Sequence, residues 1–94
     1  MKVERVLVTG LGAVSPYGRG VETMWNGLRE GRSPLRSLPG AEARPGLGVR
    51  VVGLAPELES KAIPRTYRRA MSRMGLFACL AAREALDSAG LGEA

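Results

Sequence analysis

The order of apolar and polar positions predicts two structured segments in the first half of the chain. An unbroken apolar run at 6–8 opens a predicted strand over residues 5–14, and such a run is typical of a strand covered on both faces, as in a parallel sheet. Apolar residues three and four positions apart predict a helix over 21–30, with Trp25 as a buried anchor on its apolar face. Repeated prolines and glycines then interrupt the pattern, so residues 32–48 are predicted to form a loop.

The second half of the chain predicts one more strand and a long helix. Beta-branched residues favour a strand over 49–54. Pro64 suits the first turn of a helix, and the predicted helix over 64–89 ends before Gly90, which can supply the positive φ of a helix C-terminus. Small residues recur along its second half at spacings of three and four, which lets another backbone approach closely. They are Gly75, Ala78, Cys79, Ala81, Ala82, Ala85 and Ala89.

Together these elements predict an α/β fold that is incomplete in this chain. A helix with apolar residues around most of its circumference is normally buried within a larger structure. Two strands of this type also need further strands beside them and helices on both faces. A chain of 94 residues makes at most one small domain, so we expect residues 1–94 to be a segment of one larger layered domain, with no second domain.

Composition excludes several classes of active site. The chain has no histidine and a single cysteine, so its own residues cannot build a Ser-His-Asp triad, a Cys-His pair, a zinc site or an internal disulfide. No metal and no cofactor are expected. The formal net charge of +5 suggests an acidic partner. There is no apolar run of about 18 residues and no visible signal peptide, so we expect a cytoplasmic protein without membrane contact.

Two glycines after the first strand allow two interpretations. The dinucleotide fingerprint G-x-G-x-x-G would use Gly10 and Gly12, but it requires glycine or alanine where the chain has Ser15, and Pro16 follows. The acidic residue expected about 20 positions later, at the end of a second strand, is also missing. A close packing junction is therefore favoured, and a nicotinamide-dinucleotide-dependent reductase is the alternative from another functional class.

Three segments carry a resemblance to a known family. Residues 6–18 read Val-Leu-Val-Thr-Gly-Leu-Gly-Ala-Val-Ser-Pro-Tyr-Gly, residues 20–33 contain the first predicted helix and its exit, and residues 72–91 contain the small-residue helix. In this order and spacing they resemble the N-terminal segment of β-ketoacyl-[acyl-carrier-protein] synthases, the condensing enzymes of fatty-acid and polyketide synthesis.

The resemblance implies a thiolase-like layered αβαβα fold, of which this chain holds the N-terminal part, and a homodimer in full-length form. It implies an acyltransferase that catalyses decarboxylative Claisen condensation of an acyl thioester with malonyl-acyl-carrier protein. In the family a cysteine holds the acyl group and two histidines assist decarboxylation, and none of the three can be assigned here. The chain alone is therefore expected to be inactive, and a non-catalytic synthase-like partner subunit is the close alternative.

Cys79 is not predicted to be the nucleophile. It lies among small residues of the predicted helix, where the resembling family has a packing position. A buried cysteine behaves as a small hydrophobic residue, and no adjacent cation in the sequence favours a thiolate. We therefore expect Cys79 to pack in the core, which leaves the chain with no assigned catalytic, cofactor-binding or metal-binding residue.

A basic cluster at the start of the predicted long helix is the candidate docking surface. No acidic residue occurs between Lys61 and Arg83. Spacings of i, i+3, i+4 and i+8 place four arginines on one predicted helix face. They are Arg65, Arg68, Arg69 and Arg73.

The resemblance gives this basic face a partner. In the resembling synthases, basic residues at the start of this helix help dock the acidic acyl carrier protein, so docking is predicted for Arg65, Arg68 and Arg69, with Arg69 the best positional match. Ser72 stands where the family commonly has aspartate, which removes a local partner for these arginines. A solvated face without a partner is the alternative. A nucleic-acid partner is not expected, because Tyr67 is the only aromatic residue in the cluster.

Overall fold

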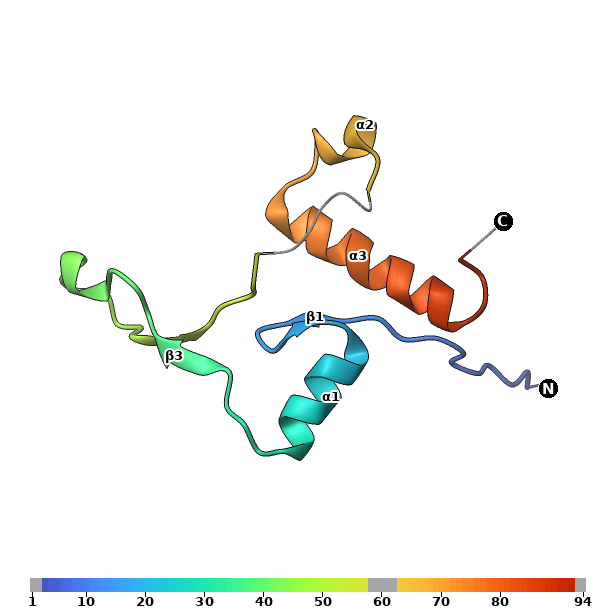
Figure 1. Ribbon diagram of the computed structural model, residues 1–94, viewed down its shortest axis with the longest axis horizontal. Helices are drawn as coiled ribbons and strands as arrows, with labels where there is room; N and C mark the ends of the chain where they lie inside the picture. The colour runs from blue at the N-terminus through green and yellow to red at the C-terminus, as the bar shows by residue number, and fades with distance from the viewer. Residues whose placement is uncertain (1–2, 58–62, 93–94) are drawn as a thin grey trace.

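The computed structural model describes residues 3–57 and 63–92, and it joins short elements by long connections (Figure 1). In chain order the elements are β1 Val14–Ser15, β2 Gly18–Arg19, α1 Val21–Arg29, β3 Leu35–Ser37, the 3-10 helix η1 Ala41–Ala43, β4 Val51–Gly53, α2 Arg65–Arg68 and α3 Arg73–Ser88. The strands form two antiparallel two-stranded sheets, β1–β2 and β3–β4. At this coarse level the mixture of helices and strands agrees with the predicted α/β class.

The strand predicted over 5–14 is wrong along most of its length. Residues 3–13 form neither helix nor strand, and only the part around Gly10 and Gly12 runs beside α3 (Figure 1). Val6, Leu7 and Val8 are 80–90% exposed. A strand needs a neighbouring backbone to complete its hydrogen bonds, and no described strand lies beside this apolar run. Pairing begins only at Val14, in the β1–β2 hairpin.

Helix α1 matches the predicted range to within one residue, but its apolar face is not buried as expected. The helix ends at Arg29 and is followed by a left-handed glycine, Gly31, whose N–H donates to the Leu28 carbonyl at 3.1 Å. The buried residue of the helix is Gly27, which lies against the ring of Tyr17. Since that side of the helix faces the β1–β2 hairpin, Trp25 is left 59% exposed, and its predicted role as a buried anchor is wrong.

Part of the predicted loop over 32–48 is structured. Strand β3 pairs antiparallel with β4, so that Leu35 lies opposite Gly53 and Ser37 opposite Val51. The Leu38 N–H extends the ladder to the Arg50 carbonyl at 2.7 Å. The predicted strand over 49–54 is thus present in its central part as β4. Pairing with it gives strand structure to the preceding segment, although prolines and glycines flank that segment.

The helix predicted over 64–89 is divided in two. Pro64 precedes the single turn of α2, and α3 starts again after Ser72, whose hydroxyl accepts a hydrogen bond from the Gly75 N–H at 3.1 Å. Ser72 is therefore the N-cap of an independent helix. The C-terminal end of α3 agrees with the sequence pattern, because Gly90 has φ 79° and the Leu91 N–H donates to the Leu86 carbonyl at 2.8 Å.

The buried core within the described residues is small. Its buried apolar members are Ala41, Ile63 and Leu80, and Leu80 on α3 is completely buried. Helix α3 packs against β1, and α1 packs against both strands of the β1–β2 hairpin. Among the residues that the structure describes, no helix is long and apolar enough to cross a membrane.

Candidate functional site

The two glycines of the opening segment form a packing junction with α3. An added Cβ at Gly10 would overlap the carbonyl oxygen of Ala85, and one at Gly12 would overlap that of Ala81. The same Cβ at Gly10 would lie 2.9 Å from the Cβ of Ala89. Real side chains do not tolerate such distances, so this contact requires glycine at positions 10 and 12 and small residues on the facing side of α3. The close approach predicted from the small-residue spacing is confirmed.

A carboxylate occupies the N-terminus of α1. The Oε2 atom of Glu84 on α3 accepts a hydrogen bond from the Val21 N–H at 3.0 Å, and its Oε1 atom accepts one from the Ala13 N–H at 2.9 Å. In a dinucleotide-binding fold the N-terminus of the first helix holds the pyrophosphate. Here the Glu84 carboxylate fills this position, and Gly10 and Gly12 pack against α3. The glycine pair that motivated the reductase interpretation therefore favours a structural role for this segment.

The three predicted docking arginines lie at α2, but they do not share one environment. Arg65 and Arg69 are exposed and border a common surface hollow of about 680 Å³ with Thr66 and Ala70. Arg68 is half-buried and borders a separate hollow of about 160 Å³. The single turn of α2 joins Arg65 and Arg69, because the Arg69 N–H donates to the Arg65 carbonyl at 3.0 Å.

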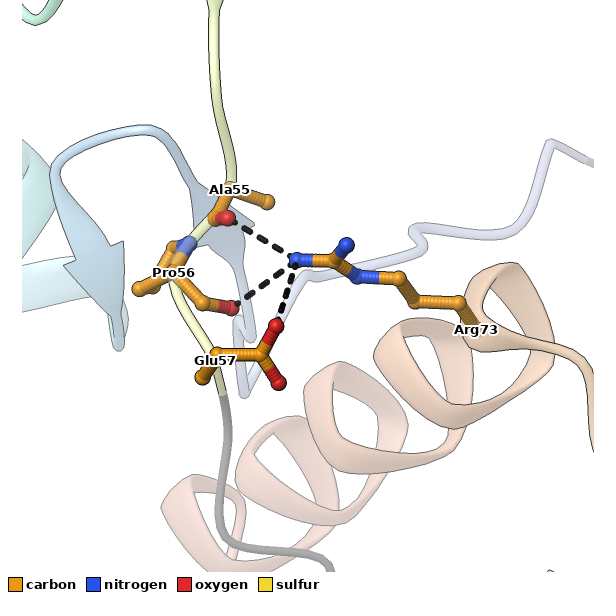
Figure 2. Close-up of polar contacts among 4 residues, drawn as sticks. All are labelled: Ala55, Pro56, Glu57 and Arg73. Atoms are coloured by element: carbon orange, nitrogen blue, oxygen red, sulfur yellow. Dashed lines mark hydrogen bonds and ion pairs between the residues drawn. The ribbon is translucent and has the colours of Figure 1, made fainter. Parts of the chain in front are cut away.

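Arg73 does not belong to the basic face that the sequence predicted. Because the helix is interrupted before Ser72, the i+8 spacing from Arg65 no longer places both residues on one helix. The Arg73 guanidinium turns toward the segment 55–57 (Figure 2). The solvent-facing basic surface, named here the α2 arginine surface, therefore consists of Arg65 and Arg69 with Arg68 at its edge.

Two residues of the site were missed by the sequence interpretation. The sequence interpretation treats Ser72 only as a replacement for aspartate, although a serine before a run of helix-forming residues is a common N-cap signal. Glu84 carried no local signal, since its hydrogen-bond partners Ala13 and Val21 lie 71 and 63 positions away in the sequence. Glu84 was detectable only once the glycine segment had been placed against α3.

The single cysteine shows no arrangement that would mark a nucleophile. Cys79 is a free, half-buried residue in the middle of α3. Within residues 3–57 and 63–92, no three or more His, Cys, Asp or Glu side chains gather in a way that could hold a metal ion. The prediction that Cys79 has a packing role stays a prediction.

Comparison with known proteins identifies the family. The profile described as "Beta-ketoacyl synthase, N-terminal domain" matches residues 3–94. The chain belongs to the beta-ketoacyl synthase family. This membership covers nearly the whole chain and includes the glycine segment, α1 and α3, so the sequence resemblance is confirmed.

Individual relatives place the chain within one part of a beta-ketoacyl synthase. A Streptomyces halstedii protein with "polyketide beta-ketoacyl synthase 2" in its name is 37% identical over 91 residues, which cover 96% of this chain and 22% of the relative. The 3-oxoacyl-[acyl-carrier-protein] synthase 2 of Staphylococcus aureus is 34% identical over 92 residues, with coverages of 94% and 21%. The mitochondrial 3-oxoacyl-[acyl-carrier-protein] synthase of Arabidopsis thaliana is 59% identical over 34 residues, with coverages of 36% and 7%. The chain therefore spans about a fifth of the length of the relatives that it matches from end to end.

Proposed function

We propose that this chain is the N-terminal part of a condensing acyltransferase. The complete synthase would join an acyl thioester to malonyl-acyl-carrier protein by decarboxylative Claisen condensation, in fatty-acid or polyketide synthesis. The observation that supports this proposal is the family match over residues 3–94, together with relatives whose names include 3-oxoacyl-[acyl-carrier-protein] synthase. The proposal extends to the thiolase-like αβαβα fold, a homodimer and a cytoplasmic location.

In this proposal the chain supplies framework and docking, and the chemistry comes from elsewhere. The family reaction uses a cysteine and two histidines, whereas this chain has no histidine. Covalent capture of the acyl group and stabilisation of the enolate therefore require side chains outside these residues. The junction of Gly10 and Gly12 with α3 and the Glu84 bridge to α1 would hold the framework in place.

The α2 arginine surface is the proposed contact for the acidic carrier protein. Arg65 and Arg69 are exposed, lie one helical turn apart and border the same hollow. The sequence from 61 to 83 contains no acidic residue that would compete for these guanidinium groups. Like-signed charges on one face raise the local concentration of an oppositely charged partner and accelerate its association.

The test is a condensation assay with acyl- and malonyl-carrier protein on the complete polypeptide that contains these residues. We expect release of carbon dioxide coupled to formation of a β-ketoacyl product, and no turnover by residues 1–94 alone. Decarboxylation or carrier-protein binding without condensation would indicate the non-catalytic partner subunit instead. A correctly folded polypeptide that neither binds carrier protein nor turns over would refute the proposal.

A further inference from the structure

Arg73 makes a three-part contact with the chain that precedes α2. One guanidinium nitrogen, Nη2, donates to the Ala55 carbonyl at 3.0 Å and to the Pro56 carbonyl at 3.5 Å, and it lies 3.9 Å from Oε1 of Glu57 (Figure 2). Two of these partners are backbone carbonyls, so the contact fixes the position of the main chain and does not depend on one mobile side chain. The Glu57 carboxylate is 98% exposed and adds little, as surface ion pairs usually do.

The same guanidinium is also held from the side of α3. It lies over the ring of Phe77, one turn further along the helix, with 5.3 Å between the guanidinium carbon and the ring centroid. A planar guanidinium can stack on an aromatic face and donate hydrogen bonds in its own plane at the same time. A lysine ammonium keeps the charge but has no plane with which to do both.

The contact of Arg73 with residues 55 and 56 closes the chain segment that contains α2. Helix α2 lies between Glu57 and Arg73 in the chain, so the contact joins the two ends of the segment that carries the α2 arginine surface (Figures 1 and 2). Arg68, the inner member of that surface, borders the same hollow as Glu57 and Arg73. Closing a loop at its base reduces the number of orientations available to its tip.

We propose that Arg73 is a positioning residue for the α2 arginine surface: by tying Ala55 and Pro56 to the first turn of α3, it fixes the orientation in which Arg65 and Arg69 meet an acidic partner. In this role Arg73 acts through its contact with residues 55 and 56 and not by touching the partner itself. The inference rests on the proposed docking function for its biological meaning, whereas the closure of the loop can be measured without any carrier protein.

The first arm of the test measures amide hydrogen exchange in the complete polypeptide. Arg73→Met and Arg73→Lys should each accelerate exchange of the amides of α2, where Tyr67, Arg68 and Arg69 donate to backbone carbonyls. We expect an increase of about tenfold, because a hydrogen bond to a charged group is lost and each tenfold change corresponds to about 1.4 kcal/mol. The α1 amides serve as the internal reference for folding, and Arg83→Met on the exposed side of α3 is the matched control. Unchanged α2 exchange in both Arg73 variants would overturn the inference.

The second arm measures the KM for carrier protein. A positioning role predicts that Arg73→Lys and Arg73→Met raise KM to a similar extent with little change in kcat, whereas Arg83→Met leaves both constants unchanged. If Arg73→Lys keeps the wild-type KM and only Arg73→Met raises it, Arg73 acts through its charge and the inference is wrong. If α2 exchange accelerates while neither Arg73→Met nor Arg69→Glu changes KM, Arg73 still closes the loop, but the proposed docking function fails.

Discussion

Gly12 and Ala81 lie in direct backbone contact, so close that a Cβ on Gly12 would overlap the Ala81 carbonyl oxygen. One turn further along α3, Gly10 is placed against Ala85 in the same manner. Gly10 and Gly12, two positions apart in the extended segment, thus contact residues that lie four positions apart on α3. Both sides of this junction must be small, which explains why glycines and alanines are placed as they are in the two segments that carry the family resemblance.

This contact predicts that Gly12→Ala destabilises the fold. The atoms that the new methyl group would meet are backbone atoms of α3, chiefly the Ala81 carbonyl. No side chain can rotate aside, so the methyl group can be accommodated only if the helix backbone moves. Overpacking of this kind costs about 1–3 kcal/mol, and more when backbone must shift. Guanidinium denaturation followed by far-ultraviolet circular dichroism should show a lower midpoint with an unchanged slope.

Gly48→Ala is the control for that experiment. Nothing lies within 4 Å of a Cβ at Gly48, and its backbone is not left-handed, so the substitution should leave stability unchanged or raise it slightly. Equal midpoints for Gly12→Ala and Gly48→Ala would contradict the packing junction and reopen the question of a ligand at Gly10 and Gly12.

Glu84→Gln is predicted to weaken the attachment of α1 to α3. The carboxylate accepts one hydrogen bond with each oxygen, from Ala13 and from Val21. An amide keeps a single acceptor and points an NH₂ group at one of the two N–H donors, and it removes the negative charge from the N-terminus of α1. The expected loss is about 1–3 kcal/mol of unfolding free energy.

The matched control for Glu84 is Glu42→Gln, which removes the same charge from an exposed residue of η1. It should leave the denaturation midpoint within error of the wild type. A further measurement isolates the mechanism: amide exchange of Val21 should accelerate in Glu84→Gln and not in Glu42→Gln. If both variants lose equal stability, the effect is one of net charge and the bridge is not responsible.

The sequence predicted those features whose cause is local. The end of α3 at Gly90 and the left-handed Gly31 after α1 depend on the few residues around them, and both are present in the structure. The close approach of another backbone to α3 was also predictable, because small residues at spacings of three and four form a helix face without bulky side chains. The identity of the approaching segment was not, since Gly12 and Ala81 are far apart in the sequence.

Features that depend on distant partners were predicted wrongly or missed. Val6–Val8 has the composition of a buried strand, yet strand structure requires a neighbouring backbone, and none of the described strands provides it. Strand β3 has weak strand propensity and forms through its pairing with β4.

Ser72 tests whether the division between α2 and α3 depends on a cap. Ser72→Ala removes the hydroxyl that accepts the Gly75 N–H at 3.1 Å, and loss of an N-cap costs about 0.5–2 kcal/mol. Ser72→Asp restores an acceptor and adds a favourable negative charge at the helix N-terminus, so it should be at least as stable as the wild type. Amide exchange of Gly75 and Leu76 should accelerate in Ser72→Ala alone. Faster exchange in both variants would indicate that the serine is required for some reason other than capping.

Charge reversal tests the docking role of the α2 arginine surface. Arg69→Glu should raise the KM for carrier protein by about fivefold, because an exposed charge contact is worth about 0.2–1 kcal/mol and reversal replaces attraction by repulsion. The value of kcat should change little, since docking precedes the chemical steps. Arg83→Glu makes the same change in net charge on α3 and should leave KM unaltered.

Salt provides the independent check on that prediction. Arg65 and Arg69 are exposed, so an attraction that they exert on an acidic partner must weaken as the Debye length falls from about 10 Å at 0.1 M salt to about 3 Å at 1 M. The KM difference between the wild type and Arg69→Glu should therefore shrink as salt is added. A difference that persists at high salt would mean that Arg69 acts through packing. Equal KM values for Arg69→Glu, Arg83→Glu and the wild type at low salt would leave the α2 arginine surface as a solvated face without a partner.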